Sequence, residues 1–287
     1  MKGDWGMKTG VIDVGGGERG VYGAGVFDTC LETGITFDYH IGVSAGAANL
    51  ASFIAGQAGR NYRFYSQYSF RKEYMGLAAF LHCGSYIDLE YIYGPALTNS
   101  TGEDPLDYDA MASSGAEYEI VATDAHSAEA VYYEMQDMEE DDYGAIKGSS
   151  CLPVVARAYR WKGRELYDGG LSDPIPVKRA FEKGCDRVVL ILTRPRDNYR
   201  DAKADELFGK LLRLTHPKAG EALLKRAETY NRELDEAKAY EKQGRLLIVA
   251  PDDIGGMKTL TKDREEIRKM YEKGKKDAGA IKGFLLR

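Results

Sequence analysis

Two glycine-rich segments and one acidic turn hold the residue types that could carry out chemistry in this sequence. The first is Gly15-Gly16-Gly17-Glu18-Arg19-Gly20, between an apolar run and a helical pattern. Glycines let the backbone turn its amides toward a ligand, and the N-terminus of the following helix adds partial positive charge. The segment is therefore a candidate anion site. It could serve as an oxyanion hole or, because its glycines also satisfy GxGxxG, as the pyrophosphate loop of a dinucleotide fold.

The second segment, Gly42-Val43-Ser44-Ala45-Gly46, has the GxSxG pattern of a nucleophile elbow. It also stands between a predicted strand and a predicted helix, which is the context that this elbow requires. Small residues around Ser44 permit a tight turn that exposes its hydroxyl. The alternative is an ordinary turn in which Ser44 caps the helix, since GxSxG also occurs by chance.

The two segments constrain each other, because both would leave neighbouring parallel strands at the same edge of a sheet, where ligands bind in such folds. A dinucleotide fold would place an acidic residue at the end of the second strand to hold the ribose. Here Ser44 stands at that strand end, and Asp38 stands near the beginning of the strand. An oxyanion loop beside a nucleophile is the better joint interpretation, with dinucleotide binding as the alternative.

A nucleophilic serine needs a base, and two kinds are available. The histidines are His40, His82, His126 and His216. Only His216 could complete the chain order Ser, Asp, His of the α/β-hydrolases, although an ordinary loop position before Pro217 is the simpler interpretation. The carboxylate candidate opens the turn Asp168-Gly169-Gly170, but Asp-Gly is also a common turn pair.

In this order, the three segments resemble the bacterial patatin-like phospholipase family. That family combines a GGGxRG oxyanion loop, a GxSxG elbow and a DGG or DGA turn that carries the base, and all three patterns are intact here. The resemblance extends to Ser149-Ser150-Cys151-Leu152-Pro153, to residues 168–177, and to a helical C-terminal part from about Pro217. The ordered set of motifs is far more specific than any one of them.

The resemblance implies a serine acyl hydrolase with a Ser-Asp dyad. Ser44 would attack an acyl carbonyl while Asp168 accepts its proton, and water would then deacylate Ser44 with Asp168 again as the base. The amides of residues 16–18 would stabilise the oxyanion, and Arg19 would orient the loop or compensate charge. The expected substrates are carboxylic esters, in particular lipid acyl chains, with no metal or cofactor. A non-catalytic lipid-binding protein and a small-molecule esterase or thioesterase with the same dyad are the alternatives.

The elements that must position these segments alternate along the chain. Strands are predicted at residues 9–14, 37–43, 117–123, 130–135, 187–193 and 246–250, and a hairpin at residues 157–161 and 165–167. Helices are predicted over residues 21–32, 45–56, 219–243 and 262–286. This alternation predicts a three-layer α/β fold, patatin-like, whose central mostly parallel sheet carries helices on both faces. The predicted division is a catalytic domain over residues 8–215 and a helical C-terminal extension over residues 216–287 packed on it.

An aromatic segment lies between residues 60 and 112. Its side chains include Tyr62, Phe64, Tyr65, Tyr68, Phe70, Tyr74, Phe80, Tyr86, Tyr91 and Tyr93. A lid or acyl-chain pocket over Ser44 would use such residues, because tyrosine suits a surface that is partly wet. A satellite core under long loops is the alternative.

Composition and charge narrow the class of protein. The net charge of −6 argues against a nucleic-acid partner, which needs clustered Lys and Arg. The four cysteines, which form no CxxC pair and predict free thiols rather than a zinc site, are Cys30, Cys83, Cys151 and Cys185. Residues 1–10 have no apolar run of signal-peptide length, and no stretch approaches the length of a membrane span. We therefore expect a soluble cytoplasmic protein, for which transient contact with a membrane surface stays open.

Overall fold

The computed structural model of the chain describes residues 6–286, so residues 1–5 of the N-terminal segment considered above lie outside the described part. One sheet of eight strands forms the centre of the molecule. The strands are β1 (Thr9–Asp13), β2 (Tyr39–Val43), β3 (Glu117–Asp124), β4 (Ala130–Glu134), β5 (Tyr159–Trp161), β6 (Arg164–Asp168), β7 (Arg187–Ile191) and β8 (Leu246–Val249). Their order is β5-β6-β3-β2-β1-β7-β8, and β4 pairs with β3 off this path.

The middle of the sheet is parallel, and the part beyond β3 is antiparallel. β1 pairs in parallel with β2 and β7, β2 with β3, and β7 with β8. β3 pairs antiparallel with β4 and β6, and β5 and β6 form the predicted hairpin. Because the central strands all run in one direction, the loops after β1, β2 and β7 open at the same edge of the sheet. The prediction of a mostly parallel central sheet is confirmed.

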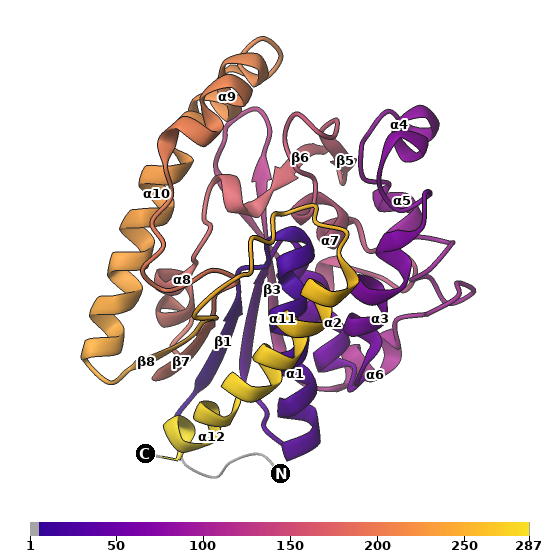
Figure 1. Cartoon of the computed structure of the whole chain (residues 1–287). Helices are drawn as coiled ribbons and strands as arrows, with labels where there is room; N and C mark the ends of the chain where they lie inside the picture. Colours follow the sequence, from indigo (N-terminus) through magenta and orange to yellow (C-terminus); the bar gives the residue numbers. More distant parts are fainter. Residues whose placement is uncertain (1–5, 287) are drawn as a thin grey trace.

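Helices cover both faces of this sheet (Figure 1). The α-helices are α1 (Val21–Thr33), α2 (Ala45–Ile54), α3 (Arg60–Ser66), α4 (Leu77–Cys83), α5 (Leu89–Ile92), α6 (Tyr108–Ser113), α7 (Gly144–Ser149), α8 (Val177–Glu182), α9 (Glu206–Leu212), α10 (Pro217–Lys242), α11 (Arg264–Asp277) and α12 (Gly279–Leu285). Short 3-10 turns are η1 (Gly17–Gly20), η2 (Tyr68–Phe70), η3 (Met135–Asp137), η4 (Gly169–Leu171) and η5 (Ala202–Asp205). The single helix predicted over residues 262–286 is wrong, because it divides into α11 and α12 beside Gly279, a poor helix former.

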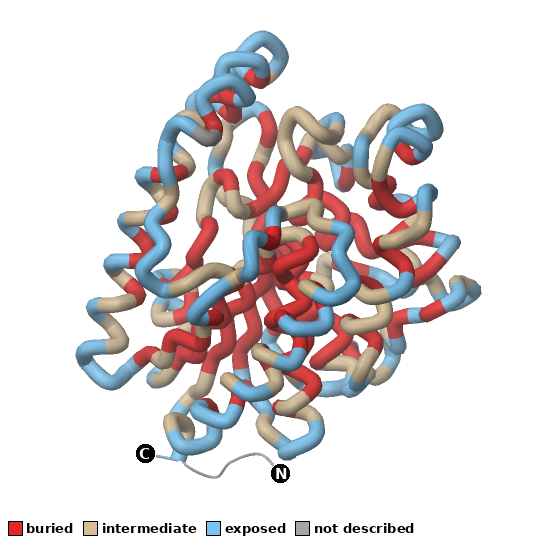
Figure 2. The backbone as a smooth tube through the Cα atoms, viewed as in Figure 1, coloured by how far each residue is buried: buried red, intermediate tan, exposed pale blue. Residues whose placement is uncertain are grey.

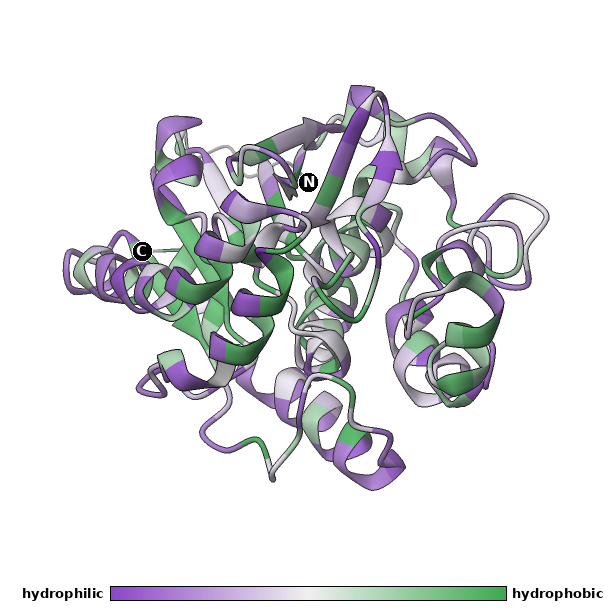
Figure 3. Ribbon diagram, turned by 90° about the horizontal axis from the view of Figure 1, so that it is seen from above, coloured by the Kyte–Doolittle hydropathy of each residue, from purple (hydrophilic) through white to green (hydrophobic). Residues whose placement is uncertain are grey.

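Two hydrophobic cores lie on the two faces of the sheet. Alternate residues of a strand point to opposite faces, so Val189 of β7 joins the core beneath α1, α2 and α11, whereas Val188 and Leu190 join the core beneath α8 and α10. Figure 2 shows the buried strands inside a shell of more exposed helices, and hydrophobic residues gather in the same inner region when viewed from above (Figure 3). No helix within residues 6–286 is both long enough and apolar enough to span a bilayer.

The C-terminal part of the chain contacts both faces of the sheet. α10 runs along one side, β8 pairs with β7, and α11 packs on α1 at the other face (Figure 1). α1 and α11 approach closely, because a Cβ on Gly25 would meet the main-chain oxygen of Tyr271 at only 2.2 Å. The boundary at residue 216 stays a prediction, and the segment beyond it contributes a strand to the sheet as well as helices.

Candidate active site

Ser44 stands in a strained turn between β2 and α2. Its φ of 58° and ψ of −133° lie in a region that residues other than glycine rarely adopt. The Ser44 amide donates to Ser149 Oγ at 2.8 Å, and Ser149 Oγ donates in turn to the Val121 carbonyl. Gly46 permits the turn, because a Cβ there would meet the Asp13 main-chain oxygen at 2.2 Å. Among the described residues, the Ser44 side chain makes no capping hydrogen bond to α2. The geometry therefore favours a nucleophile elbow over a helix cap.

The glycine-rich loop lies directly against this elbow. A Cβ on Gly15 would meet the Val43 main-chain oxygen at 2.5 Å, so only glycine fits where the two segments touch. Gly16 and Gly17 have φ values of 124° and 60°. Their amides donate to no acceptor among the described residues, and both glycines line a cavity together with Ser44. These two amides are therefore available to an oxyanion.

The Glu18 amide differs from those two. The Glu18 amide donates to the Thr259 carbonyl at 2.8 Å. It is therefore not free to bind an oxyanion, whereas the resemblance implied that it would be a donor. Arg19 Nη1 donates to Thr259 Oγ1 at 3.3 Å, and a Cβ on Gly16 would lie 3.1 Å from Arg19 Nη2. The Arg19 guanidinium thus lies beside the glycine-rich loop, where it can hold the loop in place. Gly20, the last glycine of the motif, packs where a Cβ would meet the Tyr65 hydroxyl at 2.5 Å.

Asp168 ends β6 and lines the same cavity as Ser44. Its Oδ1 accepts a hydrogen bond from the Gly170 amide at 2.8 Å, whereas its buried Oδ2 has no partner of good hydrogen-bond geometry among the described residues. Burial raises the pKa of the Asp168 carboxyl, and the nearby Ser44 hydroxyl and the Gly170 amide offset part of that rise. Gly169 permits the close turn, since a Cβ there would meet the Val121 carbonyl oxygen at 2.1 Å. One carboxylate oxygen is thus left unengaged near the Ser44 hydroxyl.

The histidines do not join this pair. None of the four, all within residues 6–286, lines a cavity that contains Ser44. His40 is buried in β2, where burial lowers its pKa to about 4. His216 stands before α10, with Nδ1 at 3.2 Å from the Tyr167 hydroxyl. The geometry supplies no imidazole that could act between Ser44 and Asp168.

A second cluster of titratable side chains lies around His216. Three residues each place one potential ligand atom within 4.8 Å of the other two, namely His126, Glu165 and His216. This arrangement could hold a metal ion. The sequence did not predict this grouping, because the three residues are far apart in the chain.

Asp38, considered above as a ribose ligand, instead accepts a hydrogen bond from the Thr9 amide at the start of β1. The end of β2 therefore has no acidic residue for a dinucleotide.

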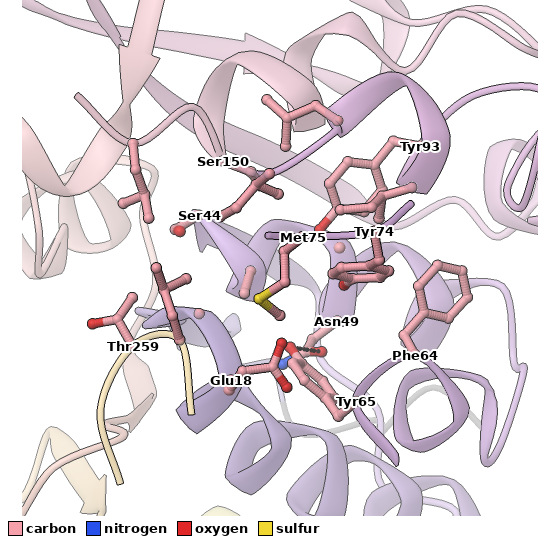
Figure 4. A pocket seen from close by; sticks show the side chains of 18 of the residues that line it. Glu18, Ser44, Asn49, Phe64, Tyr65, Tyr74, Met75, Tyr93, Ser150 and Thr259 are labelled. Carbon is pink, nitrogen blue, oxygen red and sulfur yellow. Dashed lines mark hydrogen bonds between the residues drawn. The ribbon is translucent and has the colours of Figure 1, made fainter. Parts of the chain in front are cut away.

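Ser44 lies where two cavities meet. The first, of about 60 Å³, is largely apolar (Figure 4). Its apolar lining comprises Ala45, Ala48, Phe64, Tyr65, Tyr74, Met75, Ile87, Leu89, Ile92, Tyr93, Leu152 and Leu260, and its polar lining includes Glu18, Asn49 and Arg60. Several of these residues come from the aromatic segment between residues 60 and 112, for which an acyl-chain pocket and a satellite core were the two interpretations. Other members of that segment lie elsewhere, since Tyr62 stacks on Tyr271 with ring centroids 4.1 Å apart and Phe80 is exposed.

The second cavity, of about 100 Å³, is polar and rich in positive charge. It is lined by Gly15, Gly16, Gly17, Arg19, Ser44, Asp168, Gly170, Thr193, Arg194, Arg200, Arg226, Tyr230 and Thr259, among others. No sequence pattern predicted the members beyond Gly170 as site residues. Arg194 and Arg200 follow β7, so the rule that ligands bind at the carboxyl ends of parallel strands could have found them. Arg226 belongs to a long charged helix and had no distinguishing pattern.

Comparison with known proteins connects this geometry to a family. Residues 14–181 match the family model described as patatin-like phospholipase, and residues 216–282 match a domain of unknown function, DUF6363. The uncharacterized protein YjjU of Escherichia coli (strain K12) is 31% identical over 190 residues, which cover 64% of this chain and 52% of YjjU. The chain thus spans about half the length of this curated relative.

A solved structure shows a similar fold. The crystal structure of VipD from Legionella pneumophila matches with a TM-score of 0.50 at 14% sequence identity, over 96% of this chain and 66% of the VipD chain. The family match over residues 14–181 includes the glycine-rich loop, the Ser44 elbow and the Asp168 turn. Because this family model matches more than half of the chain, the chain belongs to the patatin-like phospholipase family.

Proposed function

We propose that this chain is a serine acyl hydrolase that cleaves carboxylic esters of lipids through a dyad of Ser44 and Asp168. One observation carries the proposal. Ser44 stands on a strained turn and shares one cavity with the unengaged Oδ2 of Asp168 and with the unpartnered amides of Gly16 and Gly17. A nucleophile, a base and an oxyanion site are the three parts that acyl transfer needs. Family membership supports the same chemistry.

The proposed reaction has two steps. Ser44 Oγ attacks the acyl carbonyl carbon and gives its proton to Asp168, while the amides of Gly16 and Gly17 donate to the oxyanion. The alcohol then leaves with that proton and an acyl-enzyme remains. Water, losing a proton to Asp168, attacks the acyl group, and the free acid leaves as the proton returns to Ser44. A carboxylate is a weak base, but burial raises the pKa of Asp168 and so strengthens its hold on the transferred proton.

The apolar cavity supports an acyl chain as the part of the substrate beside Ser44. Most of its lining is aliphatic or aromatic, as in Phe64, Tyr74 and Met75 (Figure 4). Each CH₂ group buried there would contribute about 0.8 kcal/mol of binding free energy, so longer chains would bind more tightly. This favours a lipid substrate over a short-chain ester.

Exposed apolar side chains support transient contact with a membrane surface. On α4, Leu77 is 72% and Leu81 77% exposed, and on and after α9, Leu207 is 75% and Leu214 79% exposed. Both helices project from the upper end of the molecule in Figure 1, toward which the parallel strands direct their carboxyl ends. Exposed leucines on two projecting helices are typical of a surface that meets an apolar partner. In this proposal a lipid would enter the cavity at Ser44 from that end.

A fluorophosphonate probe tests the nucleophile, because only an activated serine is labelled. We expect labelling of the parent protein, loss of labelling and ester hydrolysis in Ser44→Ala with unchanged circular dichroism, and no effect of the exposed control Ser113→Ala. Turnover retained by purified Ser44→Ala would show that the nucleophile is wrongly assigned. If the parent resists the probe and only binds lipid, the chain is a lipid-binding protein.

A series of p-nitrophenyl esters from acetate to dodecanoate, with phospholipid vesicles, tests the substrate class. We expect kcat/KM to rise with chain length. A preference for acetate, with no cleavage of phospholipid, would instead indicate a small-molecule esterase.

A further inference from the structure

Four arginines but only one acidic residue, Asp168, are among the described residues that line the polar cavity beside Ser44, here called the cationic cavity. Arg19, Arg194 and Arg200 each have a buried Nε with no hydrogen-bond partner among the described residues. Arg226 differs, because its Nε donates to Asp205 Oδ2 at 2.9 Å and its Nη2 donates to Asp205 Oδ1. Burying a guanidinium without a counter-charge costs free energy, which a bound anion would offset.

The guanidinium groups are also close enough to repel one another. Burial, together with the positive charge of Arg194, lowers the pKa of Arg19 to about 10. Burial, together with the positive charges of Arg226 and Arg194, lowers the pKa of Arg200 to about 9. Arg200 lies over the Tyr230 ring at 4.6 Å, which holds its plane in one orientation. Arg19 and Arg200 therefore stay protonated at neutral pH, so the cavity that they line presents a concentrated positive charge.

This charge lies beside the proposed catalytic pair. The charges of Arg226 and Arg200 lower the pKa of Asp168, in opposition to burial. Ser44 lines both the cationic cavity and the apolar cavity. An ester bound at Ser44 with its acyl chain in the apolar cavity would therefore have the rest of the molecule among the arginines. A substrate that fits both cavities is an amphiphile with an anionic group near its ester.

We propose that Arg194, Arg200 and Arg226, with Arg19 beside the glycine-rich loop, form an anion subsite for the phosphate of a glycerophospholipid whose acyl ester lies at Ser44. The inference rests on the proposed acyl hydrolase function and adds the residues that would bind the phosphate of its substrate. The planar guanidinium donates two parallel hydrogen bonds to phosphate oxygens, a match that few other groups offer.

The first three of these arginines lie outside residues 14–181, so the motifs of the family match do not include them. Arg226 lies within residues 216–282, the part that matches a domain of unknown function. The bidentate pair with Asp205 holds Arg226 in position at the cavity. The C-terminal part would thus contribute to choosing the substrate headgroup.

Binding to the Ser44→Ala protein tests the subsite without turnover. Isothermal titration calorimetry would compare dihexanoyl phosphatidic acid with dihexanoylglycerol, which lacks the phosphate. We expect the phospholipid to bind at least about tenfold more tightly, and Arg194→Gln or Arg200→Gln to remove about that factor. Arg200→Lys keeps the charge and should retain part of the affinity. The control Arg196→Gln removes an exposed arginine of the same loop, paired with Glu241, and should bind like Ser44→Ala alone.

Inorganic phosphate distinguishes a lipid headgroup from free phosphate. We expect phosphate to compete with the phospholipid, and Arg200→Gln to weaken both ligands. The proposal is overturned if phosphate binds at these arginines without competing with the phospholipid. It is equally overturned if the folded Arg194→Gln and Arg200→Gln proteins bind the phospholipid as tightly as Ser44→Ala does. If a Gln variant fails to fold, Arg200→Lys and the comparison of the two lipid ligands decide the question.

An activity measurement complements the binding data. In the protein that keeps Ser44, we compare kcat/KM for the phospholipid with kcat/KM for p-nitrophenyl butyrate. Arg200→Gln should lower the ratio of the first to the second at least about tenfold. An unchanged ratio would contradict the subsite even if hydrolysis is confirmed. If no ester is hydrolysed, the proposed function fails while the binding result in Ser44→Ala still stands.

Discussion

The amide of Glu18 donates to the main-chain oxygen of Thr259 at 2.8 Å, and this bond ties the C-terminal part of the chain to the proposed oxyanion loop. The contact removes one of the three amides that the resemblance implied as oxyanion donors. It also places Thr259 directly over Gly17, where a Cβ would lie 2.2 Å from its main-chain oxygen. The conformation of the loop therefore depends on a residue far away in the sequence.

Gly17→Ala should lower kcat by about the 100- to 1000-fold typical of a lost oxyanion donor. The added Cβ would clash with Thr259 and would strain a residue whose φ is 60°, so the amide would move from its position. Steady-state hydrolysis of p-nitrophenyl butyrate measures the effect. Gly34→Ala is the matched control, because Gly34 has a φ of 69° but nothing within 4 Å of an added Cβ. Equal rates for Gly17→Ala and the parent would mean that the loop serves another purpose.

Asp168→Asn should abolish hydrolysis, whereas His216→Gln should stay active. The dyad uses the carboxylate itself as base, and no histidine lines the cavities at Ser44 within the described chain. Activity should fall as the pH decreases through the pKa of Asp168, which burial raises above 3.8, and this limb should be unchanged in His216→Gln. Profiles of kcat/KM against pH measure this. A folded but inactive His216→Gln protein would favour a triad instead.

Phe64→Ala should reduce the hydrolysis of long-chain esters more than that of acetate, changing their kcat/KM ratio about tenfold, since Phe64 lines the apolar cavity. Phe70→Ala is the control from the same segment, because Phe70 packs against Arg264 outside the cavity. Ala48→Leu should shift the preference the same way, because the larger side chain would fill part of the cavity without removing a core side chain. An equal loss for all chain lengths would indicate damage to the core.

Glu18→Gln should stabilise the protein in alkaline solution. Burial raises the pKa of Glu18 to about 8, so the folded protein keeps a proton that the unfolded chain loses near pH 4.5. The stability that the neutral carboxyl provides is fully present below pH 4.5 and is lost as the pH rises toward 8. Since glutamine does not ionise, the Tm of Glu18→Gln relative to the parent should increase from pH 5 to pH 8.5 in thermal unfolding. The exposed control Glu228→Gln should show no such trend, and a constant difference for Glu18→Gln would contradict the prediction.

The sequence alone determined the features that depend on neighbouring residues. Gly42 and Gly46 permit the turn at Ser44, and apolar runs such as that of β7 form strands buried on both faces, so the tight turn between β2 and α2 and the parallel sheet were predicted correctly. The break near Gly279 was missed, because helical periodicity continues across it. The helices α3 to α9 were missed as well, since elements of four to seven residues are too short to show a period.

The tertiary structure decided how distant segments meet at Ser44. The Thr259 carbonyl accepts the hydrogen bond of the Glu18 amide. The cavity at Ser44 is lined by Arg194 and Arg200 from the segment after β7 and by Arg226 from α10. No local pattern encodes these contacts, because they arise when β8 joins β7 and α10 packs along the sheet. Residue type and spacing therefore predicted the groups proposed for the chemistry. Long-range packing decided which amides stay free and which charges surround the substrate, because burial and electrostatic repulsion depend on distance in space rather than along the chain.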